Sequence, residues 1–301
     1  MPDGRLRRFL LALPIALAAA LFAAPVASAG LLFPEAGGSP NADSIKTLYI
    51  MVFVLALFIF AGVEGALIWA LVKFRARKGR TAAQIHGNTK LEIGWTVGAA
   101  VILVFITAFT FIKLGDIKDP VPSVDAQGRS LALADGAQLA STDLKSVEGP
   151  QMKIVVNGQQ YVWRYSYPGR DNLLVYSDMV VPVGMTVILD IQADDVVHSW
   201  WIPKLGGKMD AVPGYTNKTW FQIPPDAIPE GQDRVVYTGQ CAELCGRNHA
   251  NMYARVIGMR PADYERWYAD QVQALKTAKT DVAAQQKALT EQEQQGEDGG
   301  E

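Results

Sequence analysis

Two long apolar runs near the start of the chain constrain its fold more than any other feature. Leu48 to Val72 gives 25 residues with one charge, Glu64, and Ile93 to Ile112 gives 20 residues with none. A bilayer core is crossed by about 20 residues of helix, so both runs predict membrane-spanning helices. An ionisable side chain inside a span is costly, so Glu64 is either functional or a protonated or helix-paired residue that serves packing.

The segments beside these runs predict their orientation. Residues 73–90 carry six basic residues and no acidic ones, which the positive-inside rule places in the cytoplasm. At the N-terminus, three arginines precede an apolar run over residues 9–26 and the small-residue sequence Ala27-Ser28-Ala29. This layout predicts a secretory signal peptide over residues 1–29, the alternative being an uncleaved extra helix. Both cues predict a two-pass protein of a bacterial-type plasma membrane, with everything after residue 115 on the outer face.

The rest of the chain divides by composition. We expect an N-terminal segment and helical hairpin over residues 30–115, a linker over 116–149, an exported domain over 150–276 and a disordered polar tail over 277–301. A helix is predicted from Pro261 to about Lys276. Short runs rich in Val, Ile, Tyr and Trp, separated by turn residues, predict a β-sandwich or barrel. They cover residues 152–156, 161–167, 173–176, 185–191, 219–223, 234–238 and 253–259.

Charge and cysteine usage exclude two classes of protein. The formal net charge is −2, too small to indicate a nucleic-acid partner. No CxxCH motif occurs, so no haem-carrying cytochrome is fused to the chain.

One segment concentrates the metal-binding side chains. The pattern CxExCxxxHxxM runs from Cys241 through Cys245 and His249 to Met252, between two predicted strands, and His198 lies 43 residues before Cys241 at another strand end. Thiolate and thioether ligands select copper, while imidazole suits copper or zinc. A second cysteine four positions after the first lets two thiolates bridge two metals, each capped by one histidine and completed by a weak ligand.

Two other interpretations remain for this cluster. Zinc could bind two cysteines and two histidines, although structural zinc sites usually pair CxxC with two nearby histidines. A disulfide between Cys241 and Cys245 would close a very small loop and constrain little of the unfolded chain.

The chain resembles cytochrome c oxidase subunit II over roughly residues 45–270. The matching segments are HGNTKLEIGWT, DVVHSWWIPKLGGKMDAVPG and GQCAELCGRNHANM. The resemblance implies a cupredoxin-like sandwich that holds the dinuclear copper centre called CuA. The fold class is then membrane α plus β, a two-helix transmembrane hairpin followed by this sandwich.

The resemblance also implies roles for single residues. Cys241 and Cys245 would bridge two copper ions, His198 and His249 would each bind one, and Met252 and the backbone carbonyl of Glu243 would be weak axial ligands. The Glu243 side chain would bind magnesium at the contact with subunit I, near Asp210. Glu92 would lie at the cytoplasmic entrance of a proton channel.

Electron acceptance is implied at Tyr161 and Trp163. The family's aromatic segment commonly reads QWYWSYEY, and its first tryptophan faces cytochrome c; this chain has tyrosine there, at Tyr161. Trp163 is expected to pack under the loop that carries Cys241, Cys245 and His249. Asp194, Asp195 and Trp200 are candidates for orienting the ligands, with loop solvation and core packing as the other explanation.

The implied activity is that of subunit II of a respiratory oxidase. Electrons would pass from cytochrome c, a separate protein, to CuA and then to haem in subunit I, where oxygen is reduced to water and protons are pumped. Subunit I and subunit III are the expected partners within the membrane. Two alternatives are a scaffolding subunit of a quinol-oxidising relative, which would lack the copper ligands, and a membrane-tethered copper-delivery or copper-storage protein.

Overall fold

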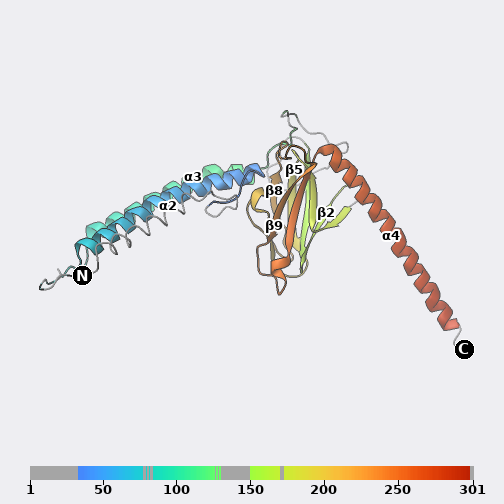
Figure 1. The fold of residues 1–301 in the computed structure, drawn as a ribbon. Helices are drawn as coiled ribbons and strands as arrows, with labels where there is room; N and C mark the ends of the chain where they lie inside the picture. The colour runs from blue at the N-terminus through green and yellow to red at the C-terminus, as the bar shows by residue number, and fades with distance from the viewer. Residues whose placement is uncertain are drawn as a thin grey trace, which may run out of the picture.

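The structure, a computed structural model, describes residues 33–76, 79, 81, 84–125, 127, 129, 150–169 and 173–298, with side chains up to residue 291. The expected signal peptide over residues 1–29 lies outside the described residues. In the described part, a helical hairpin leads into a β-sandwich, and a long helix follows it (Figure 1).

The hairpin consists of α2, Pro40–Lys73, and α3, Thr89–Lys118, which run side by side (Figure 1). Both are long and apolar enough to cross a membrane, and both extend beyond the predicted spans at each end. Proline at the first position of α2 suits a helix start because its missing N–H needs no partner there. The α3 helix starts where the Asn88 side chain accepts a hydrogen bond from Leu91 N at 3.2 Å.

The exported domain is a sandwich of two five-stranded sheets. The first sheet has the order β3-β2-β1-β5-β8, and the second has the order β4-β10-β9-β6-β7. The strands of the first sheet are β1 Gln151–Gln159, β2 Val162–Tyr167, β3 Leu173–Tyr176, β5 Thr186–Ala193 and β8 Asn217–Gln222. Those of the second are β4 Asp178–Pro182, β6 His198–Trp201, β7 Met209–Ala211, β9 Arg234–Cys241 and β10 Tyr253–Met259.

All seven predicted strands are present, and β4, β6 and β7 were not predicted. Strand β1 pairs in parallel with β5, and β4 pairs in parallel with β10. Each parallel pair joins segments separated along the chain, so the sandwich has a crossed connectivity that adjacent hairpins would not produce.

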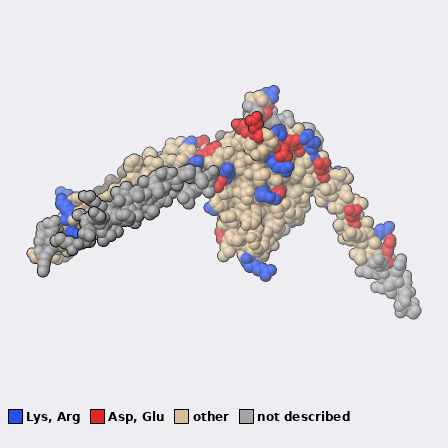
Figure 2. All heavy atoms as spheres, in the orientation of Figure 1, with Lys and Arg blue, Asp and Glu red and all other residues tan. Residues whose placement is uncertain are grey.

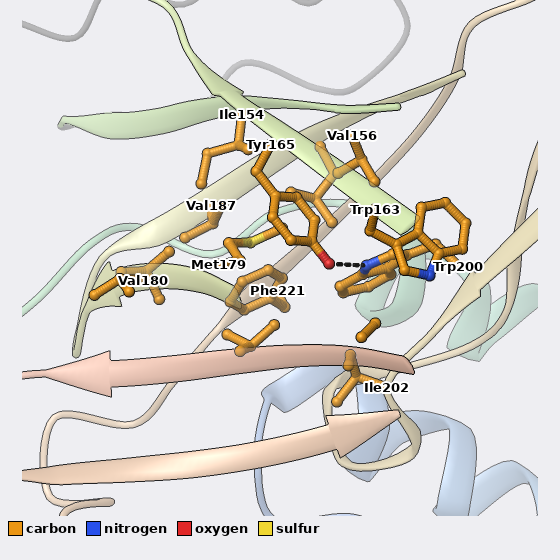
Figure 3. Close-up of a cluster of buried hydrophobic side chains, with 14 of the residues drawn as sticks. Ile154, Val156, Trp163, Tyr165, Met179, Val180, Val187, Trp200, Ile202 and Phe221 are labelled. Carbon is orange, nitrogen blue, oxygen red and sulfur yellow. Dashed lines mark hydrogen bonds between the residues drawn. The ribbon is translucent and has the colours of Figure 1, made fainter. Parts of the chain in front are cut away.

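Apolar side chains from the two sheets fill the space between them. Figure 3 shows Trp163 and Tyr165 from β2 lying near Trp200 from β6 and Phe221 from β8. The rings of Trp200 and Phe221 stack with centroids 6.4 Å apart. The indole N–H of Trp200 donates to the Tyr165 hydroxyl at 3.3 Å. Without this bond the buried N–H would have no hydrogen-bond partner in the core.

Hydrogen bonds between buried groups attach the hairpin to the sandwich. The Asn41 amide at the start of α2 donates to the backbone carbonyl of Trp220 at 2.8 Å. The Trp220 indole donates to the carbonyl of Ile117 near the end of α3 at 2.9 Å. Strand β8, an edge strand of its sheet, is therefore joined to both helices by hydrogen bonds of Trp220. These bonds hold the sandwich beside the helical hairpin.

The C-terminal helix differs from the expected tail. Helix α4 spans Pro261–Asp298 and so includes most of the residues for which we expected disorder. Its first turns pack on the sandwich through Tyr264 and Val272, while residues 276–291 are exposed and the helix points away from the sandwich (Figure 1). A polar composition excludes a core but not a helix, because Ala, Gln, Lys and Glu are good helix formers and neither proline nor glycine interrupts residues 262–295.

Candidate metal centre

Two buried thiols lie at the centre of the candidate site. Cys241 ends β9, and Cys245 follows it in the β9–β10 loop, hereafter the copper loop (residues 241–252). Their sulfur atoms are 3.9 Å apart and both thiols are free. Burial, together with the neighbouring Cys241, raises the pKa of Cys245 to about 11. A metal that binds here therefore has to displace a proton from this thiol.

One imidazole faces each sulfur. His198 is fully buried on β6, and its Nδ1 lies 3.9 Å from Cys241 Sγ. His249 starts the short helix η2, His249–Asn251, and its Nδ1 lies 3.6 Å from Cys245 Sγ. The strand register explains the first contact, because Trp200 on β6 pairs with Cys241 on β9 and so brings the remote histidine to the copper loop.

Two weaker donors complete the cluster. The Met252 thioether lies 3.8 Å from Cys245 Sγ, and the Glu243 carbonyl oxygen lies 3.2 Å from Cys241 Sγ. Met252 is fully buried, whereas the Glu243 residue itself is exposed. The structure thus brings together all six residues that the sequence predicted as copper ligands.

The donor set suits a soft metal. The ligand atoms of His198, Cys241 and Cys245 all lie within 4.8 Å of one another, close enough to hold a metal ion. Two sulfurs flanked by two imidazoles, a thioether and a carbonyl match the preferences of copper. Each sulfur also has its own imidazole, His198 beside Cys241 and His249 beside Cys245.

A carboxylate orients the remote histidine. Asp195 Oδ1 lies 2.8 Å from His198 Nε2, the ring nitrogen that faces away from the sulfurs. Burial raises the pKa of the Asp195 carboxyl, but hydrogen bonds from His198 and from the backbone N–H groups of Gln160 and Val196 outweigh burial and lower it below its usual value. As a carboxylate, Asp195 holds the proton on Nε2 and leaves Nδ1 free to bind a metal.

The other two candidates for orienting the ligands have different partners. Asp194 accepts hydrogen bonds from the side chains of Asn157 and Gln159, and these bonds, with Arg164 nearby, lower the pKa of its carboxyl. It contacts no ligand side chain in the described hydrogen-bond network. Trp200 packs in the core against Phe221.

The aromatic candidates occupy different depths. Trp163 is fully buried, and its ring lies edge-on to that of His198 with centroids 5.9 Å apart, so it packs beneath the centre. Tyr161 is half-buried beside the copper loop, where a Cβ added to Gly246 would lie 2.6 Å from its hydroxyl.

Glu92 lies far from the cluster along the chain and in the fold. It sits in the first turn of α3, exposed, where its side chain accepts a hydrogen bond from Asn88 N at 3.3 Å. Glu64 is half-buried within α2.

Two residues next to the centre were not identified from the sequence. Gly158 faces His198 so closely that an added Cβ would lie 2.8 Å from the ring. Gln160 donates to the Cys245 carbonyl at 2.6 Å. Neither belongs to the metal-binding pattern: Gly158 meets His198 across the two packed sheets, and Gln160 reaches Cys245 from the turn after β1.

A sandwich anchored by a helical hairpin, with a sulfur and imidazole cluster between strand ends, defines a membrane-anchored protein with a cupredoxin-like domain. Comparison with known families agrees. Residues 26–112 match the family model "Cytochrome C oxidase subunit II, transmembrane domain", and residues 169–258 match "Cytochrome C oxidase subunit II, periplasmic domain".

Two sequence relatives support the same family. Cytochrome c oxidase subunit 2 of Thermostichus vulcanus is 31% identical over 276 residues, covering 82% of this chain and 80% of the relative. That of Alkalihalophilus pseudofirmus is 32% identical over 233 residues, covering 76% of this chain and 58% of the relative. The solved periplasmic domain of subunit II of cytochrome oxidase of Bradyrhizobium japonicum is 29% identical, with 42% of this chain and 94% of that chain covered and a TM-score of 0.36. The chain belongs to the cytochrome c oxidase subunit II family, and its sandwich is the domain that lies outside the cytoplasm.

Proposed function

We propose that this chain receives electrons for a respiratory cytochrome c oxidase. It accepts them from cytochrome c at a dinuclear CuA centre and passes them to haem in subunit I, where oxygen is reduced to water with proton pumping. The observation that carries this proposal is the pair of free, buried sulfurs 3.9 Å apart, each with an imidazole Nδ1 within 4 Å.

Six residues would hold the copper ions. Cys241, Cys245, His198 and His249 would be the main ligands, and the remaining two donors would be Met252 and the carbonyl of Glu243. When bound, the copper pair supplies one-electron chemistry with the charge shared between two ions.

The protein keeps these ligands from moving. His198 is enclosed by Gly158 and Trp163 and is fixed by the Asp195 carboxylate. Ligands in a rigid, dry site change position little between oxidation states, so little energy is spent on reorganisation during transfer. Burial of both cysteines also excludes water that would otherwise reorient around the changing charge.

The remaining assignments concern the surroundings of the centre. Tyr161 offers a half-exposed route from the surface to the copper loop, and the buried Trp163 lies beneath it against His198. The exposed Glu243 carboxylate would bind magnesium at the contact with subunit I. Glu92, at the end of α3 far from the sandwich, would admit protons to subunit I. Subunit III is a further partner in the membrane.

Replacing one sulfur tests the function. Cys245→Ser in the assembled oxidase is expected to reduce the rate of cytochrome c oxidation at least about 100-fold, because a hydroxyl does not bridge two copper ions. Membrane insertion and association with subunit I should persist, since the sandwich and hairpin are unchanged. Ala250→Ser, which adds a hydroxyl at an exposed position of the same loop, serves as the control and should keep its activity. Retained turnover in Cys245→Ser would contradict the bridging role.

A further inference from the structure

Gln160 lies between the two segments that supply the metal ligands. It is in the turn that connects β1 and β2, which belong to the sheet opposite the one that carries His198 and Cys241. On one side is the copper loop, and on the other is the β5–β6 loop, residues 194–197, which leads into His198. The residue is exposed, so its side chain is not needed to fill the core.

The side chain of Gln160 binds the copper loop. Its amide donates to the backbone carbonyl of Cys245 at 2.6 Å. Most residues between the two cysteines and up to Asn248 are exposed, and the bond from Gln160 holds the backbone of Cys245 from outside the loop.

The backbone of Gln160 binds the other segment. Its N–H donates to Asp195 Oδ2 at 2.7 Å, and the second oxygen of the same carboxylate lies 2.8 Å from His198 Nε2. A continuous chain of hydrogen bonds therefore runs from the carbonyl of one ligand, Cys245, through Gln160 and Asp195 to the ring of another ligand, His198.

The turn also packs tightly against the copper loop. Gly246 has φ +128°, and a Cβ added there would lie 2.6 Å from the Tyr161 hydroxyl and 2.9 Å from Gln160 Nε2. Only glycine allows the loop backbone to approach the turn this closely. The contact is thus shaped on both sides, by a glycine in the loop and by two polar side chains in the turn.

We propose that Gln160 is a positioning residue that ties the copper loop to the His198 segment before metal arrives. In the copper-free protein the bond to Cys245 keeps the loop closed over the two sulfurs, so the site is formed in advance. This deepens the proposed function, but the closed loop is a property of the chain without copper and can be measured there.

The neighbouring glutamine provides a matched control. Gln159, the last residue of β1, donates from its side chain amide to the Asp194 carboxylate at 2.7 Å. Asp194 contacts no ligand side chain in the described network. Gln159→Ala and Gln160→Ala therefore remove equal amounts of side chain and one amide hydrogen bond each, and only the second variant releases the copper loop.

The experiment measures how fast the buried thiols react. Full-length, copper-free, reduced protein in detergent is treated with an aromatic disulfide reagent that reacts only when the loop opens. We expect Gln160→Ala to accelerate the reaction of Cys241 and Cys245 about 3- to 10-fold, the effect of losing one hydrogen bond on a local opening equilibrium. Gln159→Ala should react at the rate of the unmodified protein, and the thermal midpoints of both variants should match.

A second variant separates the hydrogen bond from the bulk of the side chain. Gln160→Glu keeps the length of the side chain but replaces the donor with an oxygen facing the Cys245 carbonyl. It should react at least as fast as Gln160→Ala. Equal rates for Gln160→Ala and Gln159→Ala, or a Gln160→Glu rate as slow as the unmodified protein, would overturn the proposal.

A copper-loaded sample tells this result apart from a failure of the proposed function. With copper, Gln160→Ala should shift the hyperfine pattern and optical bands of the centre, while Gln159→Ala should leave them unchanged. If the unmodified protein binds no copper pair, the proposed function fails, yet the thiol rates still decide the role of Gln160.

Discussion

At the scale of single residues, His198 depends on neighbours that no metal-binding pattern contains. Gly158 on β1 leaves room for the imidazole, Trp163 on β2 contacts its face, and Asp195 fixes its outer nitrogen. The first two come from the opposite sheet. The position of this ligand is therefore decided by how the two sheets pack, and not by the copper loop.

Adding a methyl group under His198 tests this dependence. In Gly158→Ala the new Cβ would lie 2.8 Å from the ring of His198 and 3.1 Å from that of Trp163. We expect the free energy of unfolding to fall by about 1–3 kcal/mol through overpacking and the copper affinity to fall with it. Thermal unfolding followed by circular dichroism, with copper titration, measures both quantities.

A second glycine substitution controls for the general effect of glycine replacement. In Gly207→Ala the added Cβ would meet only Ile45 Cδ1, at 3.7 Å, an ordinary contact distance. This variant should keep its stability and copper affinity. If Gly158→Ala behaves like Gly207→Ala, the close contact with His198 does not exist in solution.

At the scale of elements, the sequence predicted seven of the ten described strands and missed three. The seven predicted strands are rich in β-branched and aromatic residues. Strand β4 was not predicted, because the predicted run ends at Tyr176 and β4 begins after a single further residue, Ser177 at φ 65°. Strands β6 and β7 have only four and three residues, and neither contains a β-branched residue.

Helix α4 is longer than the sequence predicts. The polar composition after residue 276 predicts a disordered tail, whereas the helix continues to Asp298. Its first turns contact the sandwich, and its exposed remainder is held only by helix propensity and continuity with those turns.

Truncating the chain after Lys276 should therefore leave the sandwich intact. We expect the free energy of unfolding to change by less than about 0.5 kcal/mol, because the removed residues up to 291 are exposed. Far-ultraviolet circular dichroism should show the loss of helix. Tyr264→Ala in the packed part should instead cost about 3 kcal/mol. A truncation that destabilises the sandwich to that extent would show that the outer part of α4 folds back onto it.

At the scale of the whole molecule, the orientation agrees with the charge pattern. Lys73 ends α2 and Lys90 lies in the first turn of α3, at the end of the hairpin opposite the contacts of Asn41 and Ile117 with the sandwich. The part of the hairpin that Figure 2 leaves uncovered is mostly uncharged. The basic end lies in the cytoplasm by the positive-inside rule, and the sandwich lies on the other side.

The sequence predicted the ligands of the site and part of its support, namely Asp195 beside His198 and Trp163 beneath the centre. The pattern from Cys241 to Met252 and the strand-end position of His198 were readable because these residue types are chemically distinctive. The sequence did not predict the roles of Gly158 and Gln160 or the attachment through Trp220. Each of these depends on contacts between segments that lie far apart in the chain. Gly158 meets His198 across the two sheets, Gln160 reaches the copper loop from the turn between β1 and β2, and Trp220 contacts both membrane helices. These contacts leave no local mark in the sequence.

The most direct test of the proposed dinuclear copper centre is to count and characterise the metal in the purified full-length protein. Copper should be loaded in detergent, the stoichiometry measured, and the electron paramagnetic resonance spectrum recorded. The proposed dinuclear centre requires two copper ions per chain and one unpaired electron shared between both ions. One copper with a blue-copper spectrum, or zinc alone, would contradict it.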